Sequence, residues 1–271
     1  MYASSASDHA RLSFSQSTFA KSPKYEPRFY RETMGNERWK SFRVSYRETD
    51  LWIAVDREGY CRDIESFVMD RILLYRKILE EHISEYPEFR DSLVPVMAPA
   101  GVHSLVRDMY SATQSSGTGP MSAVAGAMAE YICNDMTSAF NLSEVIIENG
   151  GDIFMRLSSP ATIAVYAGSS PLSDKIGLHI KPEETPLSAC CSSGTVGHSL
   201  SFGVADACMI ACRSGAQADA YATAFCNLIK TSEDINTVTE NALQKEDILS
   251  VIIIKDDKVG MGGTIEVKLS R

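Results

Sequence analysis

The sequence lacks several features that would place it in a familiar functional class. It has no C-x-x-C motif, no Walker-type phosphate loop, no G-x-S-x-G and no H-E-x-x-H. No run approaches the roughly 20 apolar residues that a membrane-spanning helix requires, and we expect no membrane partner. The N-terminus has no basic start followed by an apolar core, so no secretory signal is expected and the cytoplasm is the predicted compartment.

Positive charge is also scarce. Lys and Arg number 26 against 35 Asp and Glu, which gives a formal charge of −9, and no Lys/Arg cluster occurs. Such a chain repels polyphosphate, so we expect no nucleic-acid partner. An apolar share of 44% is that of an ordinary globular protein.

The cysteines do not suggest a disulfide framework. There are seven, an odd number, in a chain of 271 residues that can bury a substantial core without covalent links. Cys133, Cys208, Cys212 and Cys226 lie in apolar stretches, where Cys acts as a small hydrophobe. We expect reduced core thiols, and only the Cys190-Cys191 pair lies beside a candidate site.

The chain divides into a Ser-rich start and one long patterned region. We expect residues 1–28 to form a flexible tail and residues 29–271 a single domain. Alternation and helical periodicity predict the elements. The predicted strands are 42–46, 51–55, 145–147, 153–157, 161–166, 176–180, 205–211, 248–254 and 259–269, and the predicted helices are 62–82, 102–112, one from Pro120, 216–229 and 238–243.

Two Ala-rich helical segments resemble each other. Residues 123–134 and 216–227 share six identical positions in register, including a closing Cys-Asn pair, and each is followed by an apolar strand and a hairpin. Shared composition alone is the alternative explanation. The small residues allow close approach to a sheet, a helix or a ligand. We predict an α+β fold of two strand-helix-strand repeats sharing one core, with pseudo-repeats at about 42–158 and 159–271.

One candidate metal site lies on the second Ala-rich helix. Asp219 and Thr223 are four residues apart and so share a helix face. A carboxylate and a hydroxyl on one rigid helix suit Mg²⁺, which commonly takes one or two carboxylates plus phosphate oxygens. The alternative is an Asp that satisfies the helix dipole and a Thr bonded back to its own helix.

Two polar turns are candidate ligand-binding segments. The first, Glu148-Asn149-Gly150-Gly151-Asp152, offers carboxylates and an amide at a strand end, although a tight turn alone would explain its glycines. The second runs from Ser192 through Ser193, Gly194 and Thr195 to His198 and Ser199. Its amides and hydroxyls could hold an anion, and His198 could act as a general base, the alternative being a polar loop with a structural His. Gly119, in the Gly117-to-Pro120 stretch before a helix, is a weaker anion candidate.

Taken together and in order, these motifs resemble the ApbE-like superfamily, whose named activity is FAD:protein FMN transfer. The resemblance covers about residues 42–269, and it is nearest to an uncharacterised branch that shares Glu48 to Leu51, Gly119 to Met121, Glu148 to Asp152, Ser192 to Ser199, and Ala218 to Ala220 with Ala222 and Thr223. It implies a duplicated T-fold-like arrangement. It also implies that Asp219 and Thr223 hold Mg²⁺ and that Gly150, Gly151 and Asp152 help to hold FAD. Ser193-Gly194 and His198 resemble the Ser-Gly segment and the following His of the transferases.

The sequence departs from the transferases at two places. They carry a Lys in the small-residue helix about where this chain has Ala123, and their His precedes an Asp-Pro-Arg-Thr-Gly type segment, whereas His198 precedes Ser-Leu-Ser-Phe-Gly203. The transferases are also typically exported. Three functions therefore stay open: a Mg²⁺-dependent flavin or nucleotidyl transferase, a non-catalytic binder of a flavin or nucleotide, and a participant in sulfur assimilation through Cys190-Cys191. A homo-oligomer is compatible with all three.

Overall fold

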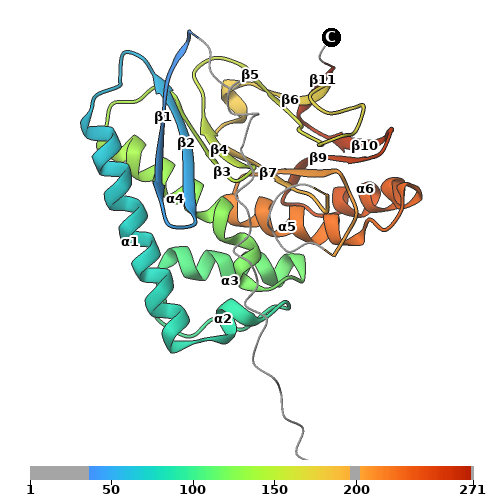
Figure 1. The fold of residues 1–271 in the computed structure, drawn as a ribbon, viewed down its shortest axis with the longest axis horizontal. Helices are drawn as coiled ribbons and strands as arrows, with labels where there is room; N and C mark the ends of the chain where they lie inside the picture. Colours follow the sequence, from blue (N-terminus) through green and yellow to red (C-terminus); the bar gives the residue numbers. More distant parts are fainter. Residues whose placement is uncertain (1–36, 196–201, 270–271) are drawn as a thin grey trace, which may run out of the picture.

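The computed structural model describes residues 37–195 and 202–269 (Figure 1). The predicted tail, 1–28, and the predicted base, His198, lie outside these residues. At the centre is an eight-stranded antiparallel sheet whose strand order follows the chain, β1-β2-β3-β4-β7-β8-β9-β10. Its strands are β1 (Trp39–Tyr46), β2 (Thr49–Asp56), β3 (Val145–Asn149), β4 (Asp152–Arg156), β7 (Leu187–Ser192), β8 (Ala207–Cys212), β9 (Ile248–Lys255) and β10 (Lys258–Gly263).

One face of this sheet is covered by helices. These are α1 (Asp63–Glu85), α2 (Glu88–Asp91), α3 (Ser104–Ser116), α4 (Val124–Ala139), α5 (Gly215–Leu228) and α6 (Ile235–Leu243), with 3₁₀ turns at Pro120–Ala123, Pro182–Glu184 and Ser232–Asp234. The helix predicted to open at Pro120 does begin there, but as a 3₁₀ turn that leads into α4. The predicted helix 102–112 begins later, at Ser104, because the side chain of His103 caps it by accepting a bond from the amide of Leu105 (3.1 Å).

The other face is covered by a small sheet in the order β11-β6-β5, drawn above the main sheet in Figure 1. It consists of β5 (Ala161–Ala164), β6 (Ile176–Ile180) and β11 (Glu266–Leu269). The prediction of one closing strand over 259–269 was therefore wrong. The chain leaves the main sheet after Gly263, whose φ is +121°, and β11 pairs with β6 instead of continuing β10.

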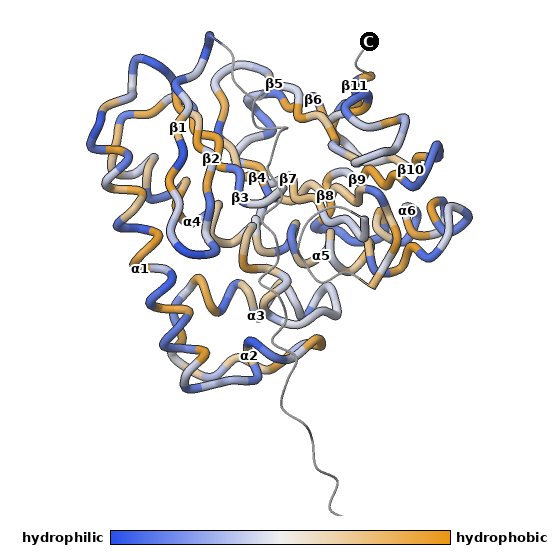
Figure 2. Tube along the Cα trace, viewed as in Figure 1, coloured by the Kyte–Doolittle hydropathy of each residue, from blue (hydrophilic) through white to orange (hydrophobic). Residues whose placement is uncertain are grey.

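The buried apolar residues form three clusters instead of the single core that we expected. Two lie between the main sheet and the helices, the first around Ile53, Met109 and Ile147 and the second around Cys208, Tyr221 and Ile253. The third lies between the two sheets. The continuous sheet separates these layers, because its central strands are buried on both faces. In Figure 2 hydrophobic segments gather along these strands and on the helix faces turned toward them.

The same order of elements occurs twice along the main sheet. The hairpin β1–β2, the helices α1 to α4 and the hairpin β3–β4 are followed by β7–β8, then α5 and α6, then β9–β10. Each unit is thus hairpin–helices–hairpin and not the simpler strand–helix–strand that we predicted. Duplication, the T-fold relationship and the repeat boundaries remain predictions.

The antiparallel register brings the turns of both units to one edge of the main sheet. Leu51 pairs with Asn149, and Asn149 pairs with Asp152. Farther along the sheet Ser192 pairs with Cys208 and Ala207 with Ile254. The β1–β2 turn, the β3–β4 turn, the end of β7, the start of β8 and the β9–β10 turn therefore lie along the same edge, which we call the turn edge.

Candidate functional site

The β3–β4 turn has the tight geometry that its glycines predict. Because Asn149 and Asp152 pair directly, Gly150 and Gly151 are the only residues between them, and both have positive φ, 73° and 108°. The amide of Gly151 donates to Oε1 of Glu148 (2.7 Å). A residue with a side chain would be strained at either glycine, so backbone geometry accounts for both.

Residues on either side of these glycines connect the turn to the rest of the site. The side-chain amide of Asn149 donates to the carbonyl of Ala125 at the start of α4 (3.1 Å). The carboxylate of Asp152 is buried and accepts the amide of Cys191 on β7 through Oδ1 (3.2 Å). Burial raises the pKa of Asp152 well above its usual value, and the negative charges of Asp219 and Glu148 raise it further. Together these effects outweigh the hydrogen bond from the Cys191 amide, which acts to lower the pKa.

The Ala-rich helices owe their small residues to a close helix crossing. A Cβ on Gly126 of α4 would lie 2.2 Å from the carbonyl oxygen of Gly215, and a Cβ on Gly215 would lie 2.2 Å from the carbonyl oxygen of Gly126. Neither contact is sterically allowed, so both positions require glycine. Of the three interpretations of the small residues, approach to another helix is the one that applies at this point.

Asp219 lies at this crossing. Its Oδ2 accepts the amide of Gly126 (2.9 Å), in the first turn of α4. Burial raises the pKa of Asp219 above its usual value, although the amides of Gly126 and Ala125 act to lower it. Thr223 follows one turn later on α5 and is half-buried. Asp152 begins β4 and Asp219 lies on α5, far apart in the sequence. The structure brings them close enough for the charge of Asp219 to raise the pKa of Asp152.

The acid pair Asp152–Asp219 has no positive partner in the part of the chain that the structure describes. Within residues 37–195 and 202–269, no Lys or Arg forms an ion pair with either carboxylate. In the same part of the chain no three His, Cys, Asp or Glu side chains form a ready-made metal cage. Mg²⁺ does not need such a cage, since it commonly binds one or two carboxylates and takes its other ligands from water and phosphate. The donor set therefore fits this cation and does not fit a structural zinc site.

The second predicted segment follows β7 along the same edge. Ser192 is the buried last residue of the strand, and the amide of Gly194 donates to the carbonyl of Ala205 (2.9 Å). A Cβ on Gly194 would lie 2.0 Å from the carbonyl oxygen of Gly203, so this glycine allows two backbone segments to meet. The hydroxyl of Ser193 accepts the amide of Thr195 (3.1 Å).

Asp206 is a site candidate that sequence reasoning missed. Its Oδ1 accepts the hydroxyl of Thr195 (3.0 Å) and its Oδ2 accepts the amide of Asp256 (2.6 Å), with the ammonium of Lys255 at 3.5 Å. An open cavity of about 450 Å³ lies here, lined by Ser169, Ser170, Pro171, Thr195, Asp206, Lys255, Asp256 and Asp257. The available signal was a carboxylate near the start of the predicted strand 205–211, which in the structure begins at Ala207 and leaves Asp206 just before it.

Two other predicted elements have structural explanations. A Cβ on Gly119 would lie 1.8 Å from the carbonyl oxygen of Ser92, so chain packing accounts for this glycine and its ligand role stays a prediction. We also expected Glu48 to Asp50 to form the turn before the strand 51–55, but this strand begins earlier, at Thr49. The turn residues are Arg47 and Glu48, and Asp50 is a buried strand residue bonded to Arg43 (2.8 Å).

The adjacent cysteines lie beside Asp152 but are not activated. The thiol of Cys190 is buried against the hydroxyl of Ser188 (3.3 Å), and burial followed by the charges of Asp152 and Asp219 raises its pKa well above the usual value. Burial and Asp152 raise the pKa of Cys191 to about 12. Since the thiolate is the nucleophile, neither residue has the environment of a reactive thiol.

None of the helices within residues 37–195 and 202–269 is long and apolar enough to cross a bilayer. Comparison with known proteins supplies the family. The family model described as AbpE bacteria matches residues 31–257. The UPF0280 protein of Methanocaldococcus jannaschii is 36% identical over 84% of this chain and 92% of its own. The UPF0280 protein of Methanopyrus kandleri is 34% identical over 82% of this chain and 90% of its own.

Solved structures share the fold at much lower identity. The flavin transferase ApbE from Vibrio cholerae has a TM-score of 0.52 and 10% identity over 83% of this chain and 97% of its own. The apo flavinyl transferase ApbE of Pseudomonas stutzeri has a TM-score of 0.50 and 11% identity over 83% of this chain and 94% of its own. At these identities the likeness shows the fold alone. The chain has an ApbE-like fold, and it belongs to the family described as AbpE bacteria, together with the UPF0280 proteins.

Proposed function

We propose that this protein binds a flavin or a related nucleotide together with Mg²⁺ at the turn edge, and that it acts as a divergent FMN or nucleotidyl transferase. The acid pair Asp152–Asp219 is the observation that carries the proposal. Asp152 is buried and Asp219 is half-buried, and within the described residues neither carboxylate has a cationic partner, so two negative charges here are unfavourable at neutral pH. A divalent cation would remove that cost, and its phosphate-bound form would bring the nucleotide to the neighbouring turns.

The chain's own residues would hold the ligand from three sides. Amides fix both carboxylates of the acid pair, that of Asp219 through Gly126 and that of Asp152 through Cys191. Thr223 would add a hydroxyl to the Mg²⁺ ligands, and the β3–β4 turn would face the flavin or base. The hydroxyls and amides of Ser192 to Thr195 are donors for phosphate or ribose. Bound Mg²⁺ would supply charge neutralisation and polarise a phosphoryl oxygen.

His198 and Gly119 keep their predicted roles in this proposal on sequence grounds. His198 would accept a proton from an acceptor hydroxyl. The cytoplasmic location likewise belongs to the proposal.

A non-catalytic binder is the second candidate. Ala123, where the transferases carry a Lys, is completely buried in the first core cluster, so no charged group reaches the ligand from that position. Flavin binding without transfer would be the expected behaviour. Sulfur transfer through Cys190-Cys191 is the function that the structure supports least, because Cys190 is buried, Cys191 is half-buried and both thiols have raised pKa values.

Thermal unfolding with FAD, FMN or nucleoside diphosphates, each with and without Mg²⁺, tests the binding proposal. A ligand at 100 times its Kd stabilises the folded state by about 2.7 kcal/mol, so the stabilising ligand should raise Tm only when Mg²⁺ is present. Asp219→Asn and Asp152→Asn should abolish the Mg²⁺ dependence, whereas Asp70→Asn, at an exposed position on α1, should preserve it. If no flavin or nucleotide raises Tm under either condition, the proposal is wrong.

Transfer needs its own assay. Intact-mass measurement on Thr- and Ser-bearing acceptor proteins, supplied with FAD and Mg²⁺, should show the addition of FMN. Binding without any mass change would leave the non-catalytic binder as the function.

A further inference from the structure

Helices α4 and α5 cap each other. The carboxylate of Glu130 on α4 accepts the amide of Gly215, the first residue of α5, through Oε2 (2.7 Å). The carboxylate of Asp219 on α5 accepts the amide of Gly126, the third residue of α4 (2.9 Å). Each helix thus offers an amide in its first turn and a carboxylate four residues later. The carboxylate of each helix accepts the first-turn amide of the other.

Neither helix has a local cap that could replace this arrangement. First-turn amides have no acceptor within their own helix. The residue before α4 is Ala123, which has no polar side chain, and no side-chain cap bond is present. Ser214 precedes α5, but it makes no cap bond of its own, and its hydroxyl donates to Glu130 (3.3 Å). The acids of the partner helices therefore supply the negative charge that the two positive helix ends favour.

Glu130 is half-buried with its carboxylate hydrogen-bonded, and the helix crossing leaves little freedom around it. Its Cβ lies 3.1 Å from the position that a Cβ on Gly215 would occupy. Burial raises the pKa of Glu130, against the lowering effect of its bonds to Gly215, Ser214 and Ala216. The side chain anchors the start of α5 at the point from which Asp219 extends, one turn farther on the same face.

We propose that Glu130 is the positioning residue for Asp219: by fixing the start of α5 against α4, it places the Asp219 carboxylate on the Gly126 amide and beside Asp152. The placement stands on the contacts themselves, and its consequence for Mg²⁺ rests on the proposed function. In this role Glu130 acts through the helix crossing, by its bonds to Gly215 and Ser214.

The Gly126 amide reports on the placement without any metal. We would measure its hydrogen exchange by NMR, relative to the amides of β8, in the full chain and in Glu130→Ala, Glu130→Gln and the exposed-helix control Glu240→Ala. In Glu130→Ala the Gly126 amide should exchange at least tenfold faster relative to β8, because Asp219 is no longer held against it. Glu130→Gln keeps an oxygen for the Gly215 amide and should stay within about threefold of the wild type, because a neutral acceptor still forms this bond at roughly half the strength of a charged one.

Mg²⁺ titration of the same proteins, followed by calorimetry, separates this inference from the proposed function. Weaker binding by at least tenfold in Glu130→Ala, with rescue in Glu130→Gln, is expected. If Gly126 exchange is unchanged in Glu130→Ala while Gly215 exchange rises, Glu130 merely caps α5 and the inference is overturned. If Gly126 responds as expected but the wild type binds no Mg²⁺, the positioning role stands and the proposed function fails. Should Glu130→Ala not fold, Glu130→Asp withdraws the carboxylate by one methylene and must give the same rise in Gly126 exchange.

Discussion

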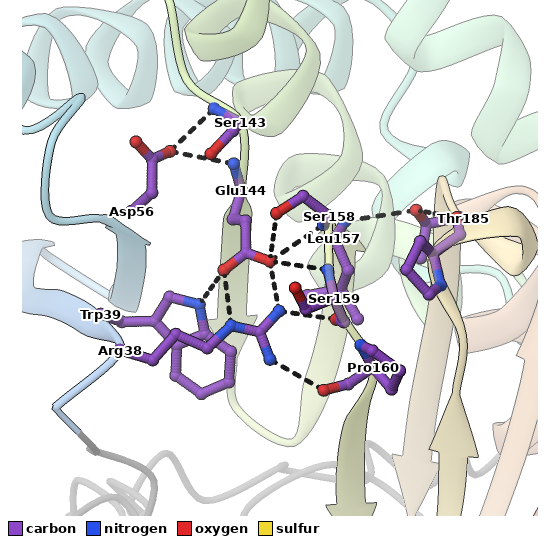
Figure 3. A network of polar contacts seen from close by, with 11 residues as sticks. Arg38, Trp39, Asp56, Ser143, Glu144, Leu157, Ser158, Ser159, Pro160 and Thr185 are labelled. Atoms are coloured by element: carbon purple, nitrogen blue, oxygen red, sulfur yellow. Dashed lines mark hydrogen bonds and ion pairs between the residues drawn. The ribbon is translucent and has the colours of Figure 1, made fainter.

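Replacing Glu144 by Gln should destabilise the protein in a way that depends on pH. Glu144 precedes β3 at the sheet edge opposite the turn edge, and Figure 3 shows its carboxylate surrounded by donors. Oε2 accepts Arg38 Nε (2.8 Å) and Trp39 Nε1 (2.7 Å). Oε1 accepts the amide and hydroxyl of Ser158 (both 2.9 Å) and the amide of Ser159 (3.1 Å). A second Arg38 nitrogen also bonds to Oε1.

The size of the effect follows from the pKa of Glu144. Burial alone would raise it, but the bonds from Arg38, Ser158 and Trp39 outweigh burial and lower it from 4.5 to about 2. At about 1.4 kcal/mol for each pKa unit this corresponds to about 3 kcal/mol. Because Arg38 is 27% exposed and partly screened by water, we expect about 2 kcal/mol.

The sign of the pH dependence is fixed by the lowered pKa. A carboxylate with a lowered folded-state pKa contributes fully above its unfolded value, near 4.5, and loses that contribution as pH falls toward about 2. Urea unfolding at pH 7 should therefore show Glu144→Gln about 2 kcal/mol less stable than the wild type. At pH 3 the difference should shrink to about half. Glu183→Gln, at an exposed position, is the control and should change stability by less than about 0.5 kcal/mol. A loss of the same size at both pH values would refute the reasoning.

Three further predictions test the packing and the thiols. Gly215→Ala should lower the free energy of unfolding by more than about 2 kcal/mol in urea titrations, because its Cβ would meet the Gly126 carbonyl at 2.2 Å, whereas Gly101→Ala has open space and only a positive φ to strain. An unchanged Gly215→Ala midpoint would contradict the close crossing. His103→Ala should cost about 1 kcal/mol by removing the cap of α3, and His103→Asn should recover most of it, as thermal unfolding can measure; equal Tm values for the two variants would argue against the cap. Native protein treated with iodoacetamide at pH 7.5 should label Cys61, which is exposed, far faster than the other six cysteines, and rapid labelling of Cys190 or Cys191 would revive the sulfur function.

Local patterns predicted most elements because the physics behind them is local. Alternation in 42–46 marked β1, the apolar run 51–55 after it marked β2, and the Asn-Gly-Gly turn marked the β3–β4 hairpin with both glycines at positive φ. The sequence could not show that β11 pairs with β6, because that pairing depends on the small sheet packing over the main one. Nor could it show three clusters, since the number of layers is a tertiary property.

In the candidate site, too, the residues could be chosen from local motifs but their tertiary contacts could not be predicted. Asp219 and Asp152 were chosen from motifs, and the structure brings them close enough for one charge to raise the pKa of the other. Glu130 was missed because no spacing rule connects it with Gly215 on another helix. The alignment of the internal repeat also differs from the equivalence of residues at the helix crossing. It aligns Gly126 with Asp219, whereas at the helix crossing Gly126 is equivalent to Gly215 and Glu130 to Asp219, a difference of one helical turn. The aligned identities therefore do not match the pairing of the helix ends at the crossing.

The strand order of the main sheet has a consequence for how the chain folds. The hairpins β1–β2, β3–β4 and β9–β10 close over tight turns, so they can form early, but β2 must meet β3 across α1 to α4 and β8 must meet β9 across α5 and α6. Loop closure costs roughly 0.6 kcal/mol for each doubling of loop length, which favours the shorter connection. The C-terminal unit should therefore assemble first and offer β7 as the edge on which β4 docks. Pulse-labelled hydrogen exchange during refolding would then protect the amides of β8 and β9 before those of β2 and β3.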